Sequence, residues 1–273
     1  MSNIANLLTS QPPPQSEGSF RKLPELIETL ATDWSKKYVS DDQWVETGKA
    51  FGGEAGSFQV KNSDGLLAMA KPGRGRDDPH CRKALEKLAC EIANLLDLPV
   101  PPVSLHELNK GTDAAHWVSL SAWAYQECYT LGNARSNGFF LPSDQAQLNL
   151  VANAAYVFDL FIGNTDRSDN NVVVGRLDNG DLGIALIDHS YSMTHGWQSD
   201  NHPWQHVHFF GTTKIKSIMK EIAERIAALS VQALRDILVA LPEQVIDAAK
   251  RERILNNLTN RSRLIVDKID QET

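Results

Sequence analysis

Three side chains with hard oxygen donors lie in one short stretch whose pattern predicts a β-hairpin. Asp166 falls in a polar loop, Asn171 follows five residues later, and Asp188 comes directly after the second predicted strand. Because paired strands end side by side, a hairpin over 172–187 brings Asn171 and Asp188 together. An amide oxygen and a carboxylate are ligands that suit Mg²⁺. The carboxylate of Asp166 is then left to position a hydroxyl nucleophile.

Such a set is typical of phosphoryl transfer, which also needs a lysine near the phosphate oxygens. The candidate is Lys71, because it ends a predicted strand behind a glycine-rich loop at 52–57. Lysine often ends a strand at a solvated surface, and hairpin tips are often rich in glycine, so these features gain weight only together with the 166–188 set. The loop residues expected at the nucleotide are Gly53, Gly56 and Ser57.

The first half of the chain predicts strands, tight turns and one helix. Asp64-Gly65 between two apolar runs is a strong hairpin signal. Apolar residues recur at helical spacing after the loop that follows Lys71; they are Leu85, Leu88, Ile92 and Leu95. The predicted strands are 44–49, 58–61, 66–71, 103–108 and 117–126, and the predicted helix is 81–96.

The second half predicts mostly helices around one hairpin. A helix begins at the Pro142-Ser143-Asp144 cap and runs to Ile162. The hairpin strands are 172–177 and 182–187, and the chain is helical from about 214 onwards, with breaks at Ser230 and Pro242. The chain is therefore expected to be α+β, with a smaller β-rich N-lobe that carries one helix and a mostly helical C-lobe. The expected boundaries are a flexible lead over 1–20, the N-lobe over 21–128 and the C-lobe over 129–273.

Composition excludes several classes of protein. The chain has 273 residues with 42% apolar residues, too many for a disordered chain. Its 27 basic and 34 acidic residues give a net charge of −7, which argues against a sequence-independent nucleic-acid binder. Three cysteines without a C-x-x-C pair argue against a disulfide framework. No apolar run is long enough for a membrane span, and the N-terminus lacks the charged region of a signal peptide. We expect a cytoplasmic protein.

These residues resemble the HipA-like kinases, a family within the phosphatidylinositol 3/4-kinase-like and protein-kinase-like fold. Asp166-Arg167 with Asn171, and then Ile187-Asp188-His189, resemble the catalytic and metal motifs of that family. The segments 68–71 and 88–101 resemble its lysine strand and following helix. The resemblance spans about 40–270 and matches the short form of the family.

The resemblance assigns roles to individual residues. Asp166 is the implied catalytic base, Asn171 and Asp188 the Mg²⁺ ligands, and Lys71 the contact to the ATP phosphates. Glu91, on the helix after the lysine strand, is the implied partner of Lys71. The implied hinge at 124–127, which includes Gln126 and Glu127, meets adenine through its backbone. A small antitoxin-like partner is also implied.

Two metal-site readings compete with this one. The loop from Asp166 resembles the start of a Ca²⁺ loop, but Asn171 and Leu177 stand where an EF-hand needs Gly and Glu. Five histidines invite a zinc site, but no carboxylate or cysteine pattern accompanies them; they are His189, His195, His202, His206 and His208. We favour the kinase interpretation over both.

The expected activity is transfer of the γ-phosphate of ATP to a protein Ser or Thr. The alternatives are a phosphoinositide or small-molecule kinase, and a nucleotide-binding pseudokinase that acts as an interaction module. The segment 189–213 is expected to contact the acceptor, and its lack of Lys and Arg favours a protein over an inositol phosphate. Ser168, where the family usually has His, is the feature that favours the pseudokinase.

Overall fold

The strands predicted in the first half of the chain form one antiparallel sheet. The computed structural model describes residues 40, 43–52, 56–73, 79–122, 128–177, 180–193, 204 and 207–272. Among these residues, five strands pair in the order β1-β2-β3-β5-β4. Their bounds are Trp44–Gly52 (β1), Ser57–Asn62 (β2), Leu67–Lys71 (β3), Val103–Leu108 (β4) and His116–Ala122 (β5). The last strand ends earlier than the predicted 126, and 123–127 lie outside the described residues.

The predicted Asp-Gly turn joins β2 to β3. The Asn62 side chain closes it, because its Oδ1 accepts hydrogen bonds from the backbone N–H groups of Asp64 at 3.1 Å and Leu66 at 2.8 Å. Gly65 has φ +87°, a conformation that only glycine adopts without strain. The turn fixes the register of β3, in which Phe58 lies opposite Ala70. Lys71 therefore ends β3 beside the residue with which β2 begins, at the same end of the sheet.

Helix α3 (Pro79–Leu95) follows this sheet and is buried on nearly all sides. Every residue from Cys81 to Cys90 is buried, although only one apolar stripe was predicted. The reason is its position: α3 packs against β4 and β5 on one side and contacts the C-terminal helix α7 (Val231–Ala240) on another. Leu95, predicted to belong to the stripe, is exposed.

A second, three-stranded sheet lies in the C-terminal part. Its order is β6-β7-β8, with bounds Cys128–Thr130, Val172–Arg176 and Leu182–Leu186. Helix α4 (Leu131–Ser136) follows β6, and α5 (Asp144–Ile162) leads towards the β7–β8 hairpin. The sequence predicted α5 and the hairpin but missed β6 and α4. Elements of three and six residues are too short to show a periodicity.

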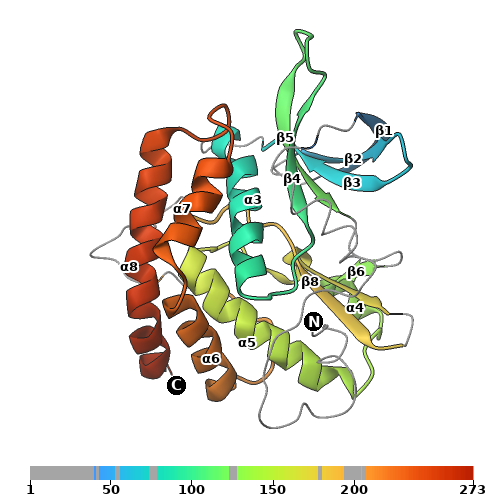
Figure 1. Ribbon diagram of the computed structural model, residues 1–273. Coiled ribbons are helices and arrows are strands. Elements are labelled where there is room, and N and C mark those ends of the chain that lie inside the picture. Colours follow the sequence, from blue (N-terminus) through green and yellow to red (C-terminus); the bar gives the residue numbers. More distant parts are fainter. Residues whose placement is uncertain are drawn as a thin grey trace.

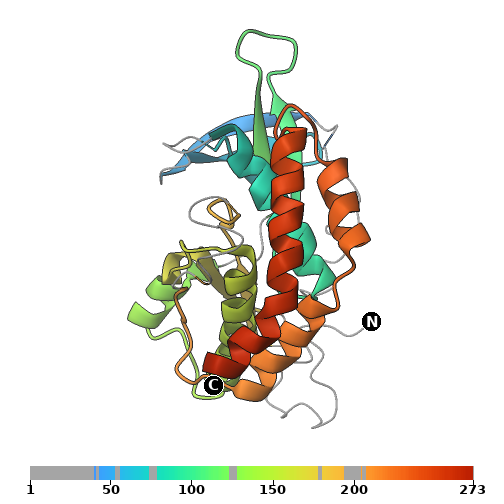
Figure 2. The same ribbon diagram turned by 90° about the vertical axis from the view of Figure 1, so that its left-hand side faces the viewer.

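The remaining helices match the predicted breaks in the chain. They are α6 (Lys216–Ala227), α7, and α8 (Ala248–Glu272). Ser230 caps α7 by accepting a hydrogen bond from the Ala233 N–H. Figures 1 and 2 show the five-stranded sheet at one end of the molecule, α5 and α6 at the other, and α8 along the side. None of the described helices is long and apolar enough to cross a membrane.

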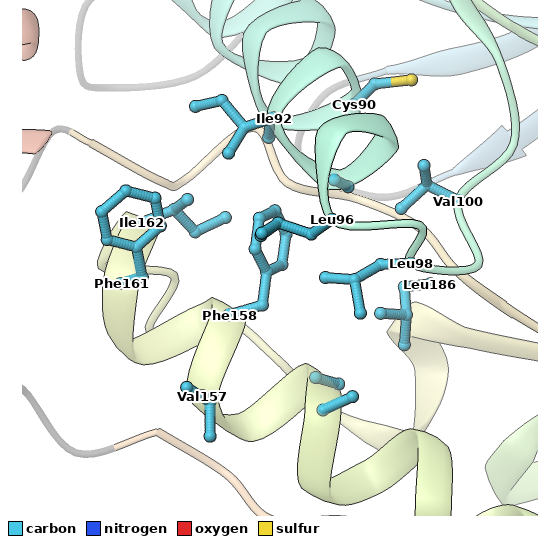
Figure 3. Close-up of a cluster of buried hydrophobic side chains, with 14 of the residues drawn as sticks. Cys90, Ile92, Leu96, Leu98, Val100, Val157, Phe158, Phe161, Ile162 and Leu186 are labelled. Atoms are coloured by element: carbon cyan, nitrogen blue, oxygen red, sulfur yellow. The ribbon is translucent and has the colours of Figure 1, made fainter. Parts of the chain in front are cut away.

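The main hydrophobic core joins α3 to the helical part. One continuous cluster of buried side chains runs from α3 through α5 and the β7–β8 hairpin to α8. In Figure 3, Phe158 of α5 points towards Leu96 at the end of α3. A smaller cluster, which includes Trp44 and Val60, packs within the five-stranded sheet. The α+β prediction, with strands first and mostly helices after, is confirmed. Helix α3 therefore lies between the five-stranded sheet and the helical part of the molecule.

Candidate active site

The β7–β8 hairpin brings Asn171 and Asp188 to the same end of the small sheet. Val172 lies opposite Leu186, and the Ile187 N–H donates to the Asn171 carbonyl oxygen at 3.1 Å. Asn171 comes directly before β7, and Asp188 comes shortly after β8, at the same end of the hairpin. The juxtaposition predicted from the spacing of these residues is confirmed.

Asp166 is held beside Asn171 by the loop that follows α5. Gly163, with φ 66°, ends α5 in the left-handed conformation and turns the chain into this loop. The Asn171 amide nitrogen donates to the Asp166 carbonyl oxygen at 2.7 Å and lies 3.4 Å from its carboxylate Oδ2. Ser168 contributes through its backbone, since its carbonyl oxygen accepts the Asn171 N–H at 2.9 Å. The Asp166 side chain is left exposed at the surface of the site.

A buried arginine fixes both strand ends. Arg167 Nε and Nη2 donate to the two carboxylate oxygens of Asp159 at 2.7 and 3.0 Å. Its Nη1 donates to the carbonyl oxygens of Asn171 at 2.6 Å and Ile187 at 2.9 Å. Asn164 also donates to Asp159, at 3.0 Å, and accepts the Asp166 N–H at 3.3 Å. One ion pair thus connects α5, the Asp166 loop and the end of the hairpin.

Sequence reasoning did not assign a role to Asp159, although a signal was present. Asp159 is a single carboxylate between Phe158 and Leu160, in a helix that is otherwise apolar there. A carboxylate that is buried in such a helix needs a cationic or hydrogen-bonding partner. Arg167, eight residues on, meets that need.

Lys71 lies between two carboxylates from different elements. Its side chain is 6% exposed, and its Nζ lies 3.1 Å from Asp188 Oδ1 and 3.3 Å from Glu86 Oε1. The other oxygen of Glu86 accepts the His189 N–H at 2.8 Å. The three charged groups come from β3, α3 and the residues after β8. The cluster therefore connects the five-stranded sheet to the hairpin through α3.

The prediction that Glu91 pairs with Lys71 is wrong. Glu91 binds Lys87, one turn earlier on the same helix, and Glu86 takes the place expected for Glu91. The two glutamates are five residues apart, so they point about 140° away from each other around the helix. Glu86 is only 2% exposed, because α3 is covered on several sides.

Charge and burial set the protonation of this cluster. Burial alone would raise the pKa of the Asp188 carboxyl, but Lys71 and the Ser190 hydroxyl lower it to about 2. Burial would lower the pKa of Lys71, and the carboxylates of Asp188 and Glu86 raise it instead. Burial holds the pKa of His189 well below its usual value, so its ring is neutral at pH 7. Lys71 and Asp188 therefore form a charged pair at neutral pH.

The donor chemistry of the site fits a divalent cation. Asn171 uses its amide nitrogen to bind Asp166, so its amide oxygen is the atom suited to a cation, together with the partly exposed carboxylate of Asp188. Within the described ranges, no group of three or more His, Cys, Asp or Glu side chains is arranged for a metal. A cation held by Asn171 and Asp188 would complete its shell with water and phosphate oxygens.

The glycine-rich loop is described only in part. Gly56, with φ 66°, comes directly before β2, and the buried Ser57 begins that strand at the same end of the sheet as Lys71. Gly53, and the hinge residues Gln126 and Glu127, lie outside the described residues.

With this geometry in place, comparison with solved structures identifies the fold. The chain is similar to the Helicobacter pylori proinflammatory kinase CtkA, with a TM-score of 0.61 and 14% identity over 87% of this chain and 99% of that one. It is also similar to the Golgi casein kinase with Mn/ADP bound, with a TM-score of 0.51 and 14% identity over 92% and 77% of the two chains. The fold is protein-kinase-like. No protein-family profile and no curated protein sequence matches the chain.

Proposed function

We propose that the protein is an ATP- and Mg²⁺-dependent kinase of the HipA-like type that phosphorylates Ser or Thr in a protein. The observation that carries this proposal is the convergence of Lys71, Asp188, Asn171 and Asp166 at the end of one hairpin. Asp166, Asp188 and Glu86 bring three carboxylates to the cluster, against the one ammonium group of Lys71. A polyphosphate is repelled by such a site unless a divalent cation accompanies it.

Asp166 is proposed to accept the proton of the acceptor hydroxyl. The hydroxyl oxygen forms a bond to the γ-phosphorus, the bond from that phosphorus to the β–γ bridging oxygen breaks, and ADP leaves. Hydrogen bonds from Asn171 hold the backbone and carboxylate of Asp166, so the base is oriented before the acceptor arrives. Its exposure leaves it accessible to a hydroxyl on another molecule.

Lys71 is proposed to bind phosphate oxygens through its ammonium group. Glu86 keeps that group at the end of β3, and the hydrogen bond from the His189 N–H to Glu86 fixes the carboxylate in turn. A Mg²⁺ ion held by Asn171 and Asp188 would neutralise charge that develops on the phosphates. The contact between Lys71 and Asp188 places the phosphate and cation groups side by side.

A protein acceptor is favoured over an inositol phosphate. The segment 189–213 contains no Lys or Arg that would pair with a phosphorylated head group. Of its described residues, His208 is exposed and Phe209 is partly exposed, so these two side chains are available to contact a peptide.

The test is incubation with γ-labelled ATP, Mg²⁺ and a mixture of Ser/Thr peptides, with Asp166→Asn compared to Asp64→Asn. Asp64 is an exposed turn carboxylate before the start of β3, at the opposite end of that strand from Lys71, and its variant controls for loss of one charge. We expect transfer by the wild type and by Asp64→Asn, and a fall of about 10²- to 10⁴-fold in Asp166→Asn. Binding of ATP without transfer by the wild type would instead favour the pseudokinase alternative.

A further inference from the structure

A cavity of about 410 Å³ opens beside the loop that carries Asp166. Four segments of the chain form its walls. They are α4 through Arg135, residues 140–148 at the start of α5, Asp169 in the Asp166 loop, and residues 208–212. The volume lies within the range of pockets that enclose small ligands, roughly 300–1,000 Å³. It is therefore large enough for an aromatic side chain.

The walls of this cavity are held in place by hydrogen bonds. Arg135 donates both to the Asp169 carboxylate and to the Phe210 carbonyl oxygen, and so joins two of the walls. The Thr212 N–H donates to Asn149 Oδ1 at 2.8 Å, which fixes the 208–212 segment to α5. Gly211 packs so closely that an added Cβ would lie 2.8 Å from a carbon of Ala152. The cavity is thus formed before a ligand enters.

The charges in the cavity compensate one another. Arg135 pairs with Asp169, and His208 Nε2 lies 3.6 Å from the other oxygen of the same carboxylate. Much of the remaining surface is apolar and comes from Phe140, Leu141, Leu148, Phe209 and Phe210. A charged ligand group would lose its water without meeting a free counter-ion among these residues, whereas an apolar group gains from burial.

The position of the cavity relates it to the acceptor hydroxyl. Asp169 is three residues from Asp166, so the two residues are separated by at most about 11 Å of chain. An extended peptide covers the same distance in three or four residues. A substrate whose hydroxyl lies at Asp166 can therefore reach the cavity with a side chain three or four residues away.

We propose that this cavity binds a large uncharged side chain, aromatic or aliphatic, three or four residues at most from the phosphorylated Ser or Thr. The inference rests on the proposed kinase function and adds the substrate class. Leu141, whose side chain is 55% exposed, lies on the cavity wall where an incoming peptide chain would pass.

The experiment measures both phosphorylation and binding of Ser-containing peptides in which each flanking position is varied in turn. We expect a large apolar residue at one position to raise phosphorylation and affinity roughly ten- to hundredfold over Asp or Lys there. Gln145→Trp, on the exposed start of α5, fills the cavity and should abolish this preference. Ala146→Trp adds the same side chain at the next exposed position, which does not line the cavity, and should retain it.

A change of charge gives a second readout. Leu141→Glu should shift the preferred residue from apolar to Lys or Arg, because it adds an unpaired carboxylate to the cavity wall. Phosphorylation without a flanking preference, or with one that Gln145→Trp and Leu141→Glu leave unchanged, would overturn the inference. The binding arm separates it from the kinase proposal. Binding that follows the expected preference without any transfer would contradict only the proposed catalysis.

Discussion

Two clusters of charged residues lie close together at the end of the hairpin, yet they differ in how completely they are satisfied. Arg167 and Asp159 are fully buried, and the guanidinium makes four hydrogen bonds of 2.6–3.0 Å. Lys71 contacts Asp188 and Glu86 at 3.1 and 3.3 Å, and the Asp188 side chain is 31% exposed. The first cluster is a closed scaffold, whereas the second is open on the side of Asp188.

The difference follows from the side chains and from the segments that they connect. A guanidinium is planar and binds a carboxylate through two parallel hydrogen bonds, while an ammonium is a point charge that can exchange partners. Arg167 lies within one stretch of chain, 159–187, whose local structure fixes every partner. Lys71, at the end of β3, meets groups from two other parts of the fold, α3 and the residues after β8. A site that must admit phosphates needs the second kind of cluster, positioned by the first.

The largest expected effect is on stability and comes from breaking the closed cluster. Arg167→Met removes both hydrogen bonds from the guanidinium to Asp159 and leaves its buried carboxylate without a counter-ion, with Asn164 still donating to it, which should cost about 3–5 kcal/mol of unfolding free energy. Urea denaturation measures this loss. The double variant Asp159→Leu/Arg167→Met should recover part of it, because no buried charge remains. A loss below about 1 kcal/mol in Arg167→Met would show that the cluster is not a scaffold.

Breaking the open cluster should affect activity more than stability. Glu86→Gln keeps an acceptor for the His189 N–H but removes the charge that holds Lys71, so phosphoryl transfer should fall about 10²-fold through misplacement of the ammonium. The matched control is Glu91→Gln, on the same helix, which breaks only the pair with Lys87. Initial rates at saturating ATP compare the two variants. Equal losses in both would contradict the assignment of Glu86.

The candidate site shows both where sequence reasoning succeeds and where it fails. The hairpin and its turn place Asn171 and Asp188 near each other through local structure, so their proximity follows from the spacing alone. The partner of Lys71 depends on the rotational orientation of α3 about its own axis, between the sheet and the helical part. The helical spacing of apolar residues in α3 does not reveal that orientation. A helix covered on several sides buries charged residues that its sequence pattern assigns to solvent.

The Arg167 scaffold and the cavity illustrate a second limit. The sequence contains a carboxylate, Asp159, in an apolar helix and an arginine, Arg167, eight residues later. Their pairing depends on the left-handed turn at Gly163 that reverses the chain. The cavity is assembled from residues between Arg135 and Thr212 that belong to four segments. Such a site has no local signature, so it could be recognised only after those segments were placed in space.

The contrast between the clusters should also appear in the dependence of stability on pH. The folded-state pKa of the Asp188 carboxyl is lowered to about 2, below its unfolded value of about 3.9. The pair with Lys71 therefore stabilises the folded protein fully when the pH is above about 3.9. This stabilisation is lost as the pH falls through about 2. The shift corresponds to about 2 kcal/mol. The stability difference between wild type and Asp188→Asn should therefore shrink by that amount between pH 6 and pH 2. Urea midpoints across this range test it, with Asp64→Asn as control; a constant difference would contradict the assigned pair.

The smallest effect is expected where both partners are exposed. Arg235 on α7 lies 2.8 Å from Glu252 on α8, a shorter contact than either one made by Lys71, but the two side chains are 44% and 58% exposed. Water screens this pair and the side chains lose entropy in forming it, so Arg235→Ala should cost less than about 1 kcal/mol in urea denaturation. If it cost as much as Arg167→Met, distance rather than burial would determine the strength of ion pairs in this protein. The distinction between a closed scaffold and an open site would then lose its physical basis.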